Sequence, residues 1–145
     1  MDIVSKAKRS QMMSGIKSKN TKPEIIIRKY LFSKGLRYRI NQKIENIKPD
    51  IVLKKYKTCI FVHGCFWHRH PKCKLASQPK SNQRFWNSKF KSNISRDKKN
   101  INELIKAGWK VGIIWECSVR SKSYKKFDFL SAIQNEILWT VDENK

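Results

Sequence analysis

Acidic residues are scarce in this sequence. It holds 11 Asp and Glu against 33 Lys and Arg, which leaves a net charge of +22. Such a balance favours nucleic acid or another anionic surface as the binding partner. The alternative is compositional drift in an AT-rich coding sequence, which enriches Lys, Asn and Ile. Drift does not by itself remove the acids, so we favour nucleic acid.

Long apolar segments are missing as well. No run of 18 apolar residues is present, so the sequence predicts no membrane span, and we expect no membrane among its partners. The opening Met-Asp-Ile-Val-Ser-Lys contains no apolar stretch of the kind that directs export, and we therefore expect a cytoplasmic protein. Without an export signal, the four cysteines argue against a disulfide framework. One of them, Cys59, lies inside an apolar run and is expected to be a small buried hydrophobic residue.

The chain has 145 residues, 39% of them hydrophobic, which is enough for one domain with its own core. We expect a basic N-terminal arm over residues 1–20 and a single domain over residues 21–145. A basic arm ahead of a folded domain often wraps a nucleic-acid groove. The alternative is a terminus that takes no part in binding.

The pattern of apolar residues predicts the element order α-β-β-β-α-β-α. A capping box from Thr21 to Glu24, with Pro23 in the first turn, starts a helix that runs to about Ser33. We expect strands at residues 36–41, 50–53, 58–63 and 110–115, and further helices at 83–107 and 128–139. Residues 64–82 are irregular. A mixed sheet with helices on both faces is the natural packing for this order.

The irregular segment contains a cluster of thiols and imidazoles. It reads Cys65-Phe66-Trp67-His68-Arg69-His70-Pro71-Lys72-Cys73. Cys65, His70 and Cys73 follow C-x4-H-x2-C spacing, and Cys117 comes directly after the apolar strand at 110–115. Thiolate and imidazole ligands together suit zinc, and four of them complete a tetrahedral structural site. The alternative is a chance cluster of reduced cysteines and solvent histidines.

His63 and His68 are left outside this ligand set. Because the pKa of histidine lies near neutrality, both are candidates for proton transfer, with a supporting or surface role as the alternative. Asp50 opens an apolar strand and Glu24 lies in the first turn of a helix, and such hard oxygen ligands suit Mg²⁺. The alternatives are a turn role for Asp50 and a capping role for Glu24.

Pro49 and Asp50 before an apolar strand are similar to the motif of the PD-(D/E)xK nucleases. The usual Glu-x-Lys is absent from the next strand, which reads Ile60-Phe61-Val62-His63-Gly64.

Further motifs make the pattern specific. They are Pro49-Asp50, Phe61-Val62-His63-Gly64-Cys65-Phe66-Trp67-His68, Gly108-Trp109-Lys110-Val111 and Trp115-Glu116-Cys117. The arm Lys8-Arg9-Ser10 with Met12-Met13, Thr21 to Glu24, and Arg84-Phe85-Trp86 extend them. Together these motifs resemble the very short patch repair (Vsr) family of DNA mismatch endonucleases.

The resemblance implies an α/β fold of the restriction-endonuclease-like, PD-(D/E)xK type, with a mixed central sheet flanked by helices and a structural zinc. It also implies a bacterial enzyme that meets its substrate in the nucleoid. Members nick DNA on the 5′ side of the thymine in a T·G mismatch, and repair synthesis then replaces the thymine.

Residue roles follow from the same resemblance. Asp50 would bind catalytic Mg²⁺ together with the backbone carbonyl of Val62. His68 would be the catalytic histidine at the scissile phosphate, assisted by Glu24 and His63. The zinc ligands would be Cys65, His70, Cys73 and Cys117.

The DNA contacts implied by the resemblance are aromatic wedges. Phe66, Trp67 and Trp86 would enter the base stack beside the mismatch, with Met13 entering from the minor groove. Apolar wedges exchange lost base stacking for aromatic contact, and a mismatch is an easy place to unstack. From the residues alone, core packing of Phe66 and Trp67 is the alternative.

We therefore expect a monomeric, Mg²⁺-dependent endonuclease with a structural zinc, acting on double-stranded DNA that carries a T·G mismatch. Repair-pathway proteins would be its further partners. Two other functions stay open: a zinc-containing DNA-binding module without catalysis, and a nuclease of the same fold with a different DNA target.

Overall fold

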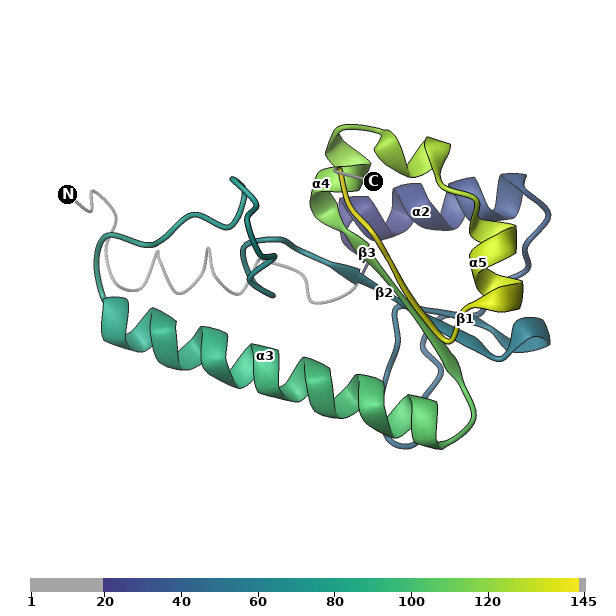
Figure 1. The fold of residues 1–145 in the computed structure, drawn as a ribbon, viewed down its shortest axis with the longest axis horizontal. Coiled ribbons are helices and arrows are strands. Elements are labelled where there is room, and N and C mark those ends of the chain that lie inside the picture. Colours follow the sequence, from purple (N-terminus) through teal and green to yellow (C-terminus); the bar gives the residue numbers. More distant parts are fainter. Residues whose placement is uncertain (1–19, 144–145) are drawn as a thin grey trace.

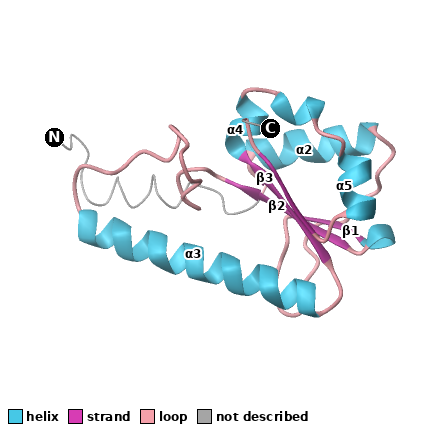
Figure 2. Ribbon diagram, in the orientation of Figure 1, coloured by secondary structure: helices cyan, strands magenta, loops and turns pink. Residues whose placement is uncertain are grey.

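The computed structural model describes residues 20–143, and a four-stranded mixed sheet lies at the centre of this part of the chain (Figure 1; Figure 2). The strands are β1 (Ile51–Leu53), β2 (Thr58–His63), β3 (Lys110–Trp115) and β4 (Leu138–Val141), side by side in that order. β1 is antiparallel to β2, whereas β2, β3 and β4 are parallel. A short 3₁₀ turn, η1 (Lys54–Tyr56), joins the antiparallel pair.

Helices cover both faces of the sheet, which confirms the expected α/β fold class. α2 (Lys22–Ser33), α4 (Glu116–Arg120), the 3₁₀ turn η2 (Ser123–Lys126) and α5 (Phe129–Asn135) lie on one face (Figure 1). α3 (Gln83–Lys106) lies on the other face, and its first half extends beyond the sheet (Figure 1). α2, α3 and the strands β1 to β3 form within one or two residues of the predicted bounds.

Alternating side chains along the strands give the sheet two separate cores. Ile60 of β2 belongs to the core beneath α2 and α5, whereas its neighbour Cys59 belongs to the core beneath α3. Cys59 is fully buried, as its apolar run predicted. By the same alternation His63 and Trp115, at the ends of β2 and β3, point to the α3 side of the sheet.

α2 begins as its capping box predicts. The Thr21 hydroxyl accepts a hydrogen bond from the Glu24 N–H at 3.4 Å, and Pro23 stands in the first turn. After the helix the chain reverses at Gly35, which has φ +84°, and the Leu36 N–H returns to the Leu31 carbonyl at 3.0 Å.

The strand predicted at residues 36–41 is wrong. This segment makes a single antiparallel bridge, between Arg39 and Val52, and no strand. The alternation of apolar residues is real, but Asn41 adopts a left-handed conformation with φ 58°, which ends the extended backbone directly after Ile40.

The helix predicted at residues 128–139 is too long. α5 ends at Asn135, Glu136 is extended with φ −115° and ψ 137°, and the chain then enters β4. Trp139, Thr140 and Val141 favour strands, and pairing with β3 gives their backbone hydrogen-bond partners that a last helical turn would not. α4, after β3, was not predicted.

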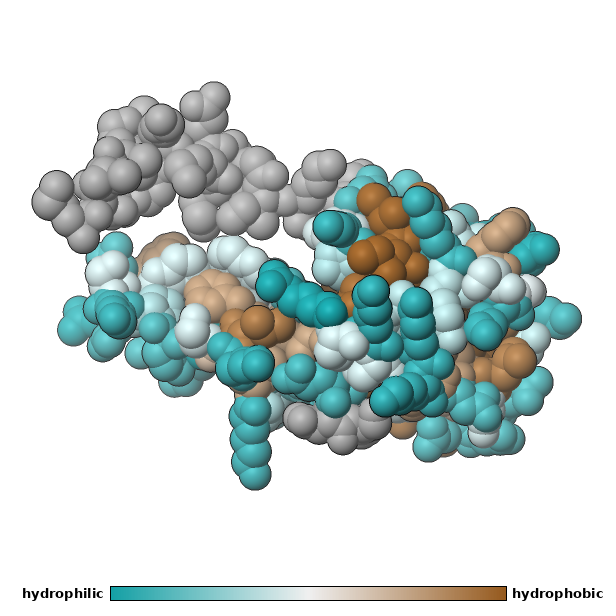
Figure 3. Space-filling view, turned by 90° about the horizontal axis from the view of Figure 1, so that it is seen from above, coloured by the Kyte–Doolittle hydropathy of each residue, from teal (hydrophilic) through white to brown (hydrophobic). Residues whose placement is uncertain are grey.

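None of the helices in the described part of the chain combines the length and apolarity that crossing a bilayer demands. Hydrophilic side chains cover most of the face shown in Figure 3, and hydrophobic residues gather in smaller patches between them. The predicted basic arm, with Met13, lies outside the described residues apart from Asn20.

β4 packs closely on β3 at Gly112. A side chain added at Gly112 would place its Cβ 2.2 Å from the ring of Trp139, which stands over the glycine from the neighbouring strand. Gly112→Ala is therefore expected to destabilise the fold by about 1–3 kcal/mol, because the indole must leave its place in the core. Urea unfolding measures the change. Gly64→Ala, where the new Cβ meets nothing closer than 3.4 Å, is the matched control. Equal stability of the two variants would contradict the close packing.

Candidate active site and metal centre

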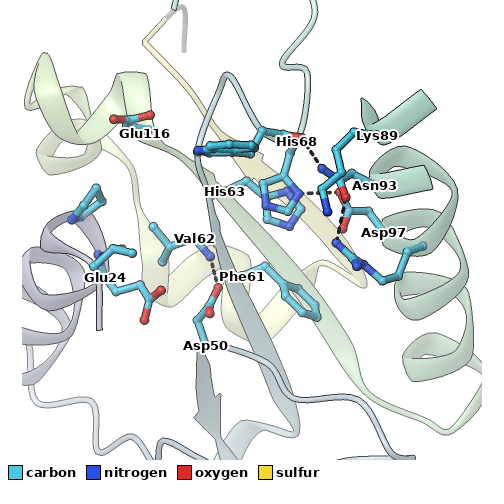
Figure 4. Close-up of a pocket in the computed structure, with 15 residues that line it drawn as sticks. Glu24, Asp50, Phe61, Val62, His63, His68, Lys89, Asn93, Asp97 and Glu116 are labelled. Atoms are coloured by element: carbon cyan, nitrogen blue, oxygen red, sulfur yellow. Dashed lines mark hydrogen bonds and ion pairs between the residues drawn. The ribbon is translucent and has the colours of Figure 1, made fainter. Parts of the chain in front are cut away.

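A pocket of about 620 Å³ opens at the carboxyl ends of β2 and β3, between α2 and α3. All four predicted catalytic residues line it: Glu24, Asp50, His63 and His68 (Figure 4). Val62 lines it as well. Asp97, Asn93 and Lys89 come from α3 on the opposite side (Figure 4), and Arg96 of the same helix also lines the pocket. The four predicted residues span 44 positions of the sequence, from Glu24 to His68, and the fold brings them to one cavity.

Asp50 lies just before β1 and is tied to the neighbouring strand. Its Oδ2 accepts a hydrogen bond from the Val62 N–H at 2.7 Å. Burial, and then the nearby Glu24 carboxylate, raise the pKa of Asp50 from 3.8 to about 7, although the Val62 hydrogen bond and the charge of Arg28 act in the opposite direction. A carboxylate so reluctant to ionise is a suitable partner for a cation.

Glu24 combines a structural role with a place in the pocket. It is 2% exposed, and its Oε2 accepts hydrogen bonds from the Asn20 N–H at 2.9 Å and from Nη2 of Arg28 at 3.0 Å. Both donors hold the same oxygen, so the carboxylate is fixed beside Asp50 (Figure 4). A role at the start of α2 and a place in the pocket are therefore compatible for Glu24.

Two histidines form a stacked pair on the other side of the pocket. The rings of His63 and His68 lie 3.8 Å apart between centroids and within 4° of parallel. Nδ1 of His68 is 2.6 Å from Oδ2 of Asp97, which fixes the orientation of that imidazole. Burial, and then the neighbouring His68, lower the pKa of His63 to about 3, so His63 stays neutral.

Asp97 is a site residue that the sequence reasoning missed. It lies on α3, 29 residues after His68, and only the fold brings the two together. A signal was available: Asp97 is one of 11 acids in the chain and stands among the basic residues Arg96, Lys98 and Lys99.

A second cluster gathers the four predicted zinc ligands. One ligand atom from each of Cys65, His70, Cys73 and Cys117 lies within 4.8 Å of all the others. Nδ1 of His70 is 3.6 Å from the sulfur of Cys65 and 3.6 Å from that of Cys117. Sulfur and nitrogen donors converging in this way could hold a metal ion.

Further hydrogen bonds, within the cluster and to carboxylates next to it, hold these residues in place. The Cys65 N–H donates to Oε1 of Glu116 at 3.3 Å, and the Cys117 N–H donates to the sulfur of Cys65 at 3.4 Å. Nε2 of His70 lies 3.3 Å from a carboxylate oxygen of Asp142, beyond β4. A carboxylate behind a ligating imidazole is the usual support for a metal-bound histidine.

Burial raises the pKa of the Cys65 thiol, and it raises that of Cys117 as well. Without a cation both groups are therefore neutral near pH 7, whereas a bound metal would stabilise the thiolates. The donor set and its burial thus fit a metal centre.

The predicted wedge residues form an aromatic cluster beside the pocket. Phe66 makes edge contacts with Trp67 at 5.2 Å and with Trp86 at 5.6 Å, and Phe90 of α3 packs beneath them. The guanidinium of Arg69 lies 4.2 Å from the ring centre of Phe90 and donates to the Ala76 carbonyl at 2.9 Å. Phe66, Trp67 and Trp86 are half-buried, so each offers part of a ring to solvent.

Known DNA endonucleases are similar to this chain. The family model described as DNA mismatch endonuclease Vsr matches residues 1–75. The chain is 52% identical to the type II nicking enzyme V.NmeAIP of Neisseria meningitidis, over 84% of this chain and 86% of that protein. It is 38% identical to the type II nicking enzyme V.XorIIP of Xanthomonas oryzae, over 81% and 86%. It is 37% identical to the DNA mismatch endonuclease Vsr of Escherichia coli, over 83% and 77%.

A solved structure with a similar fold is the catalytic domain of the homing endonuclease I-Bth0305I. The TM-score is 0.53 at 19% identity, over 79% of this chain and 94% of that domain. At this identity the likeness concerns the fold alone.

The raised pKa of Asp50 makes its ionised form costly to the fold. An unfolded chain releases the proton near pH 4, while the folded protein keeps it to about pH 7, so stability falls as pH rises through this interval. Asp50→Asn cannot ionise, and it is expected to raise the free energy of unfolding at pH 8 by about 1–3 kcal/mol more than at pH 5. Urea unfolding in magnesium-free buffer measures this. The exposed Glu136→Gln variant is the control, and equal effects of Asp50→Asn at the two pH values would refute the assignment.

Proposed function

This chain belongs to the Vsr family of DNA mismatch endonucleases and is a DNA endonuclease, and from that premise we propose that it nicks the 5′ side of the thymine in a T·G mismatch. The nick would start very short patch repair, with repair-pathway proteins as further partners. The enzyme would act as a monomer through residues 21–145, with the basic arm of residues 1–20 along the DNA.

The observation that carries this proposal is the pocket in which two carboxylates and a histidine pair face each other (Figure 4). Hydrolysis of a phosphodiester requires a positioned water, a group that takes its proton and a positive charge at the phosphate. Asp50 and Glu24 on one side, with His68 and Asp97 on the other, supply the protein's share of these parts.

Mg²⁺ fits the carboxylate side of the pocket. Because Oδ2 of Asp50 accepts the Val62 N–H, Oδ1 is left for a cation, and the backbone carbonyl of Val62 would be a further oxygen ligand. A divalent cation would also offset the cost of ionising Asp50 beside Glu24. Bound there, Mg²⁺ would supply charge stabilisation at the scissile phosphate. Glu24, fixed by Arg28, would help to position the attacking water.

His68 would accept the proton of that water. The carboxylate of Asp97 at Nδ1 keeps the ring proton on that nitrogen, which leaves Nε2 as the proton acceptor. His63 would assist as a neutral ring against His68, since its lowered pKa keeps a second positive charge out of the site.

Zn²⁺ is the proposed ion of the second cluster, because three thiolates with one imidazole suit zinc better than a hard cation. Its role would be structural. It would join the loop of residues 64–82, through Cys65, His70 and Cys73, to Cys117 after β3.

Phe66, Trp67 and Trp86 would enter the base stack beside the mismatch, with Met13 entering from the minor groove. The support is their partial exposure next to the pocket, where a deformed duplex would present its phosphate. The net charge of +22 would add attraction to the phosphate backbone.

A second candidate is a nicking enzyme of the same fold with another DNA target. The relatives named type II nicking enzymes, at 52% and 38% identity, favour it. Nicking rates on matched duplexes and on a panel of mismatches at equal salt separate the two candidates. A T·G duplex nicked no faster than a matched duplex would exclude mismatch specificity.

The catalytic assignment predicts that Asp50→Ala and His68→Ala each slow nicking at least about 1,000-fold, because each removes a group required at the reacting phosphate. Single-turnover nicking of a labelled T·G duplex in Mg²⁺ measures the rate constant. Duplex affinity and zinc content are expected to stay near those of the parent protein, which is the control for folding. Full activity in either variant would refute the role of that residue.

The metal assignment predicts that Cys117→Ala loses stoichiometric zinc, since three ligands from one loop hold the ion far less firmly than four. Emission spectroscopy of the purified protein measures the metal. Cys59→Ala, which removes a buried thiol outside the cluster, is the matched control and should keep its zinc. Unchanged zinc in Cys117→Ala would overturn the ligand set.

A further inference from the structure

His63 is held in the pocket by ring packing. It is 5% exposed, and its Nδ1 has no hydrogen-bond partner among the described residues. An imidazole at a functional site is ordinarily oriented by a hydrogen bond at its second nitrogen, as Asp97 orients His68. The plane of His63 must therefore be set by the rings around it.

Three rings surround His63. His68 stacks on it at 3.8 Å, and Phe61 of the same strand lies at 5.8 Å. Trp115 meets it edge-on, with the ring centres 5.3 Å apart and the planes at 73°. Trp115 is also the residue opposite His63 in the parallel ladder of β2 and β3, so the sheet itself fixes where the indole stands.

The same indole also lies on the metal cluster. Trp115 stacks on His70 with ring centres 4.2 Å apart and planes within 12°. His70 in turn contacts two sulfur atoms of the cluster and the carboxylate of Asp142. An uninterrupted series of ring contacts therefore runs from His70 through Trp115 and His63 to His68.

We propose that Trp115 is a positioning residue: it rests on the metal-ligating ring of His70 and thereby holds His63, and through it His68, in the orientation that nicking requires. This inference rests on the proposed nuclease function. It gives the metal centre a second role, because a fixed His70 ring is the surface against which Trp115 is seated.

Indole suits this position for a geometric reason. One ring system must stack on His70 and still present an edge to His63, and a tryptophan side chain is large and flat enough for both contacts. A leucine keeps apolar bulk but offers neither a flat face nor an edge. A phenylalanine keeps a flat ring of smaller extent.

The test is Trp115→Leu, with phenylalanine at the same position as the second variant. In single-turnover nicking at saturating enzyme, Trp115→Leu is expected to be about 10- to 100-fold slower, because small misplacements of a catalytic group cost this much. Zinc content and duplex affinity are expected to be unchanged. Trp115→Phe is expected to lie between the parent protein and the leucine variant.

Nuclear magnetic resonance gives a reading that does not depend on catalysis. The chain has three histidines, and all three belong to this array, so the ring-proton spectrum of isotope-labelled histidine is simple to assign. At one fixed pH, Trp115→Leu is expected to shift the ring protons of His63 and His68 by removing ring-current and packing effects. Trp115→Phe is expected to shift them less.

The matched control is Trp109→Leu. Trp109 is a partly buried tryptophan at the other end of β3, packed against the core beneath α3. Its replacement should leave the histidine signals and the nicking rate near those of the parent protein. Unshifted His63 and His68 signals together with a full nicking rate in the Trp115 variants would overturn the inference. If one of the two variants does not fold, the other variant alone is enough for this test. Zinc loss in a Trp115 variant that keeps the histidine signals unshifted would also overturn it. Failure of the parent protein to nick a T·G duplex would instead count against the proposed function.

Discussion

Parallel pairing of β2 with β3 is the constraint on which the rest of the structure depends. Its register sets His63 opposite Trp115 and brings Cys65 to Cys117, although 52 residues separate the two cysteines. Parallel neighbours cannot be joined by a tight turn, so the chain must cross over. The crossover consists of the loop of residues 64–82 and then α3, which returns Asp97 to the histidines. One pairing event therefore assembles the pocket, the cysteine–histidine cluster and the aromatic cluster together.

The pocket and the cysteine–histidine cluster both contain groups whose burial is unfavourable without their ligands. Burial pushes the pKa of Asp50 up and that of His63 down, and it keeps the thiols of Cys65 and Cys117 protonated. Arg28 offsets part of the repulsion between the Glu24 and Asp50 carboxylates, because its guanidinium pairs with Glu24 at 3.0 Å. The two apolar cores on either side of the sheet must offset the rest of this unfavourable free energy. Asp50 and His63, whose pKa values are strongly shifted, line the same pocket, and such a pair is typical of a functional site.

Local signals predicted those parts of the fold that local interactions determine. The capping box located the start of α2, and the apolar stripe with Gly108 behind it located α3. Two segments whose structure depends on tertiary pairing were predicted wrongly: residues 36–41 form a bridge only, and the segment after Asn135 joins the sheet because β3 offers it partners. The site followed the same rule. Neighbouring motif residues such as His63, Cys65 and His68 could be selected from sequence and family resemblance, whereas the pairing of Asp97 with His68 becomes visible only when α3 has folded back.

The separation of Cys117 from the other three cluster residues bears on the order of folding. Cys65, His70 and Cys73 lie within one short loop, so they can approach each other at little entropic cost even in a largely unfolded chain. Cys117 can join them only after β3 has docked beside β2, a long-range step that is slow in parallel sheets. An ion captured early by the loop would then be locked in by sheet formation. In the native protein, its exchange with solvent would be governed by the opening of the β2–β3 pair rather than by the strength of the individual bonds.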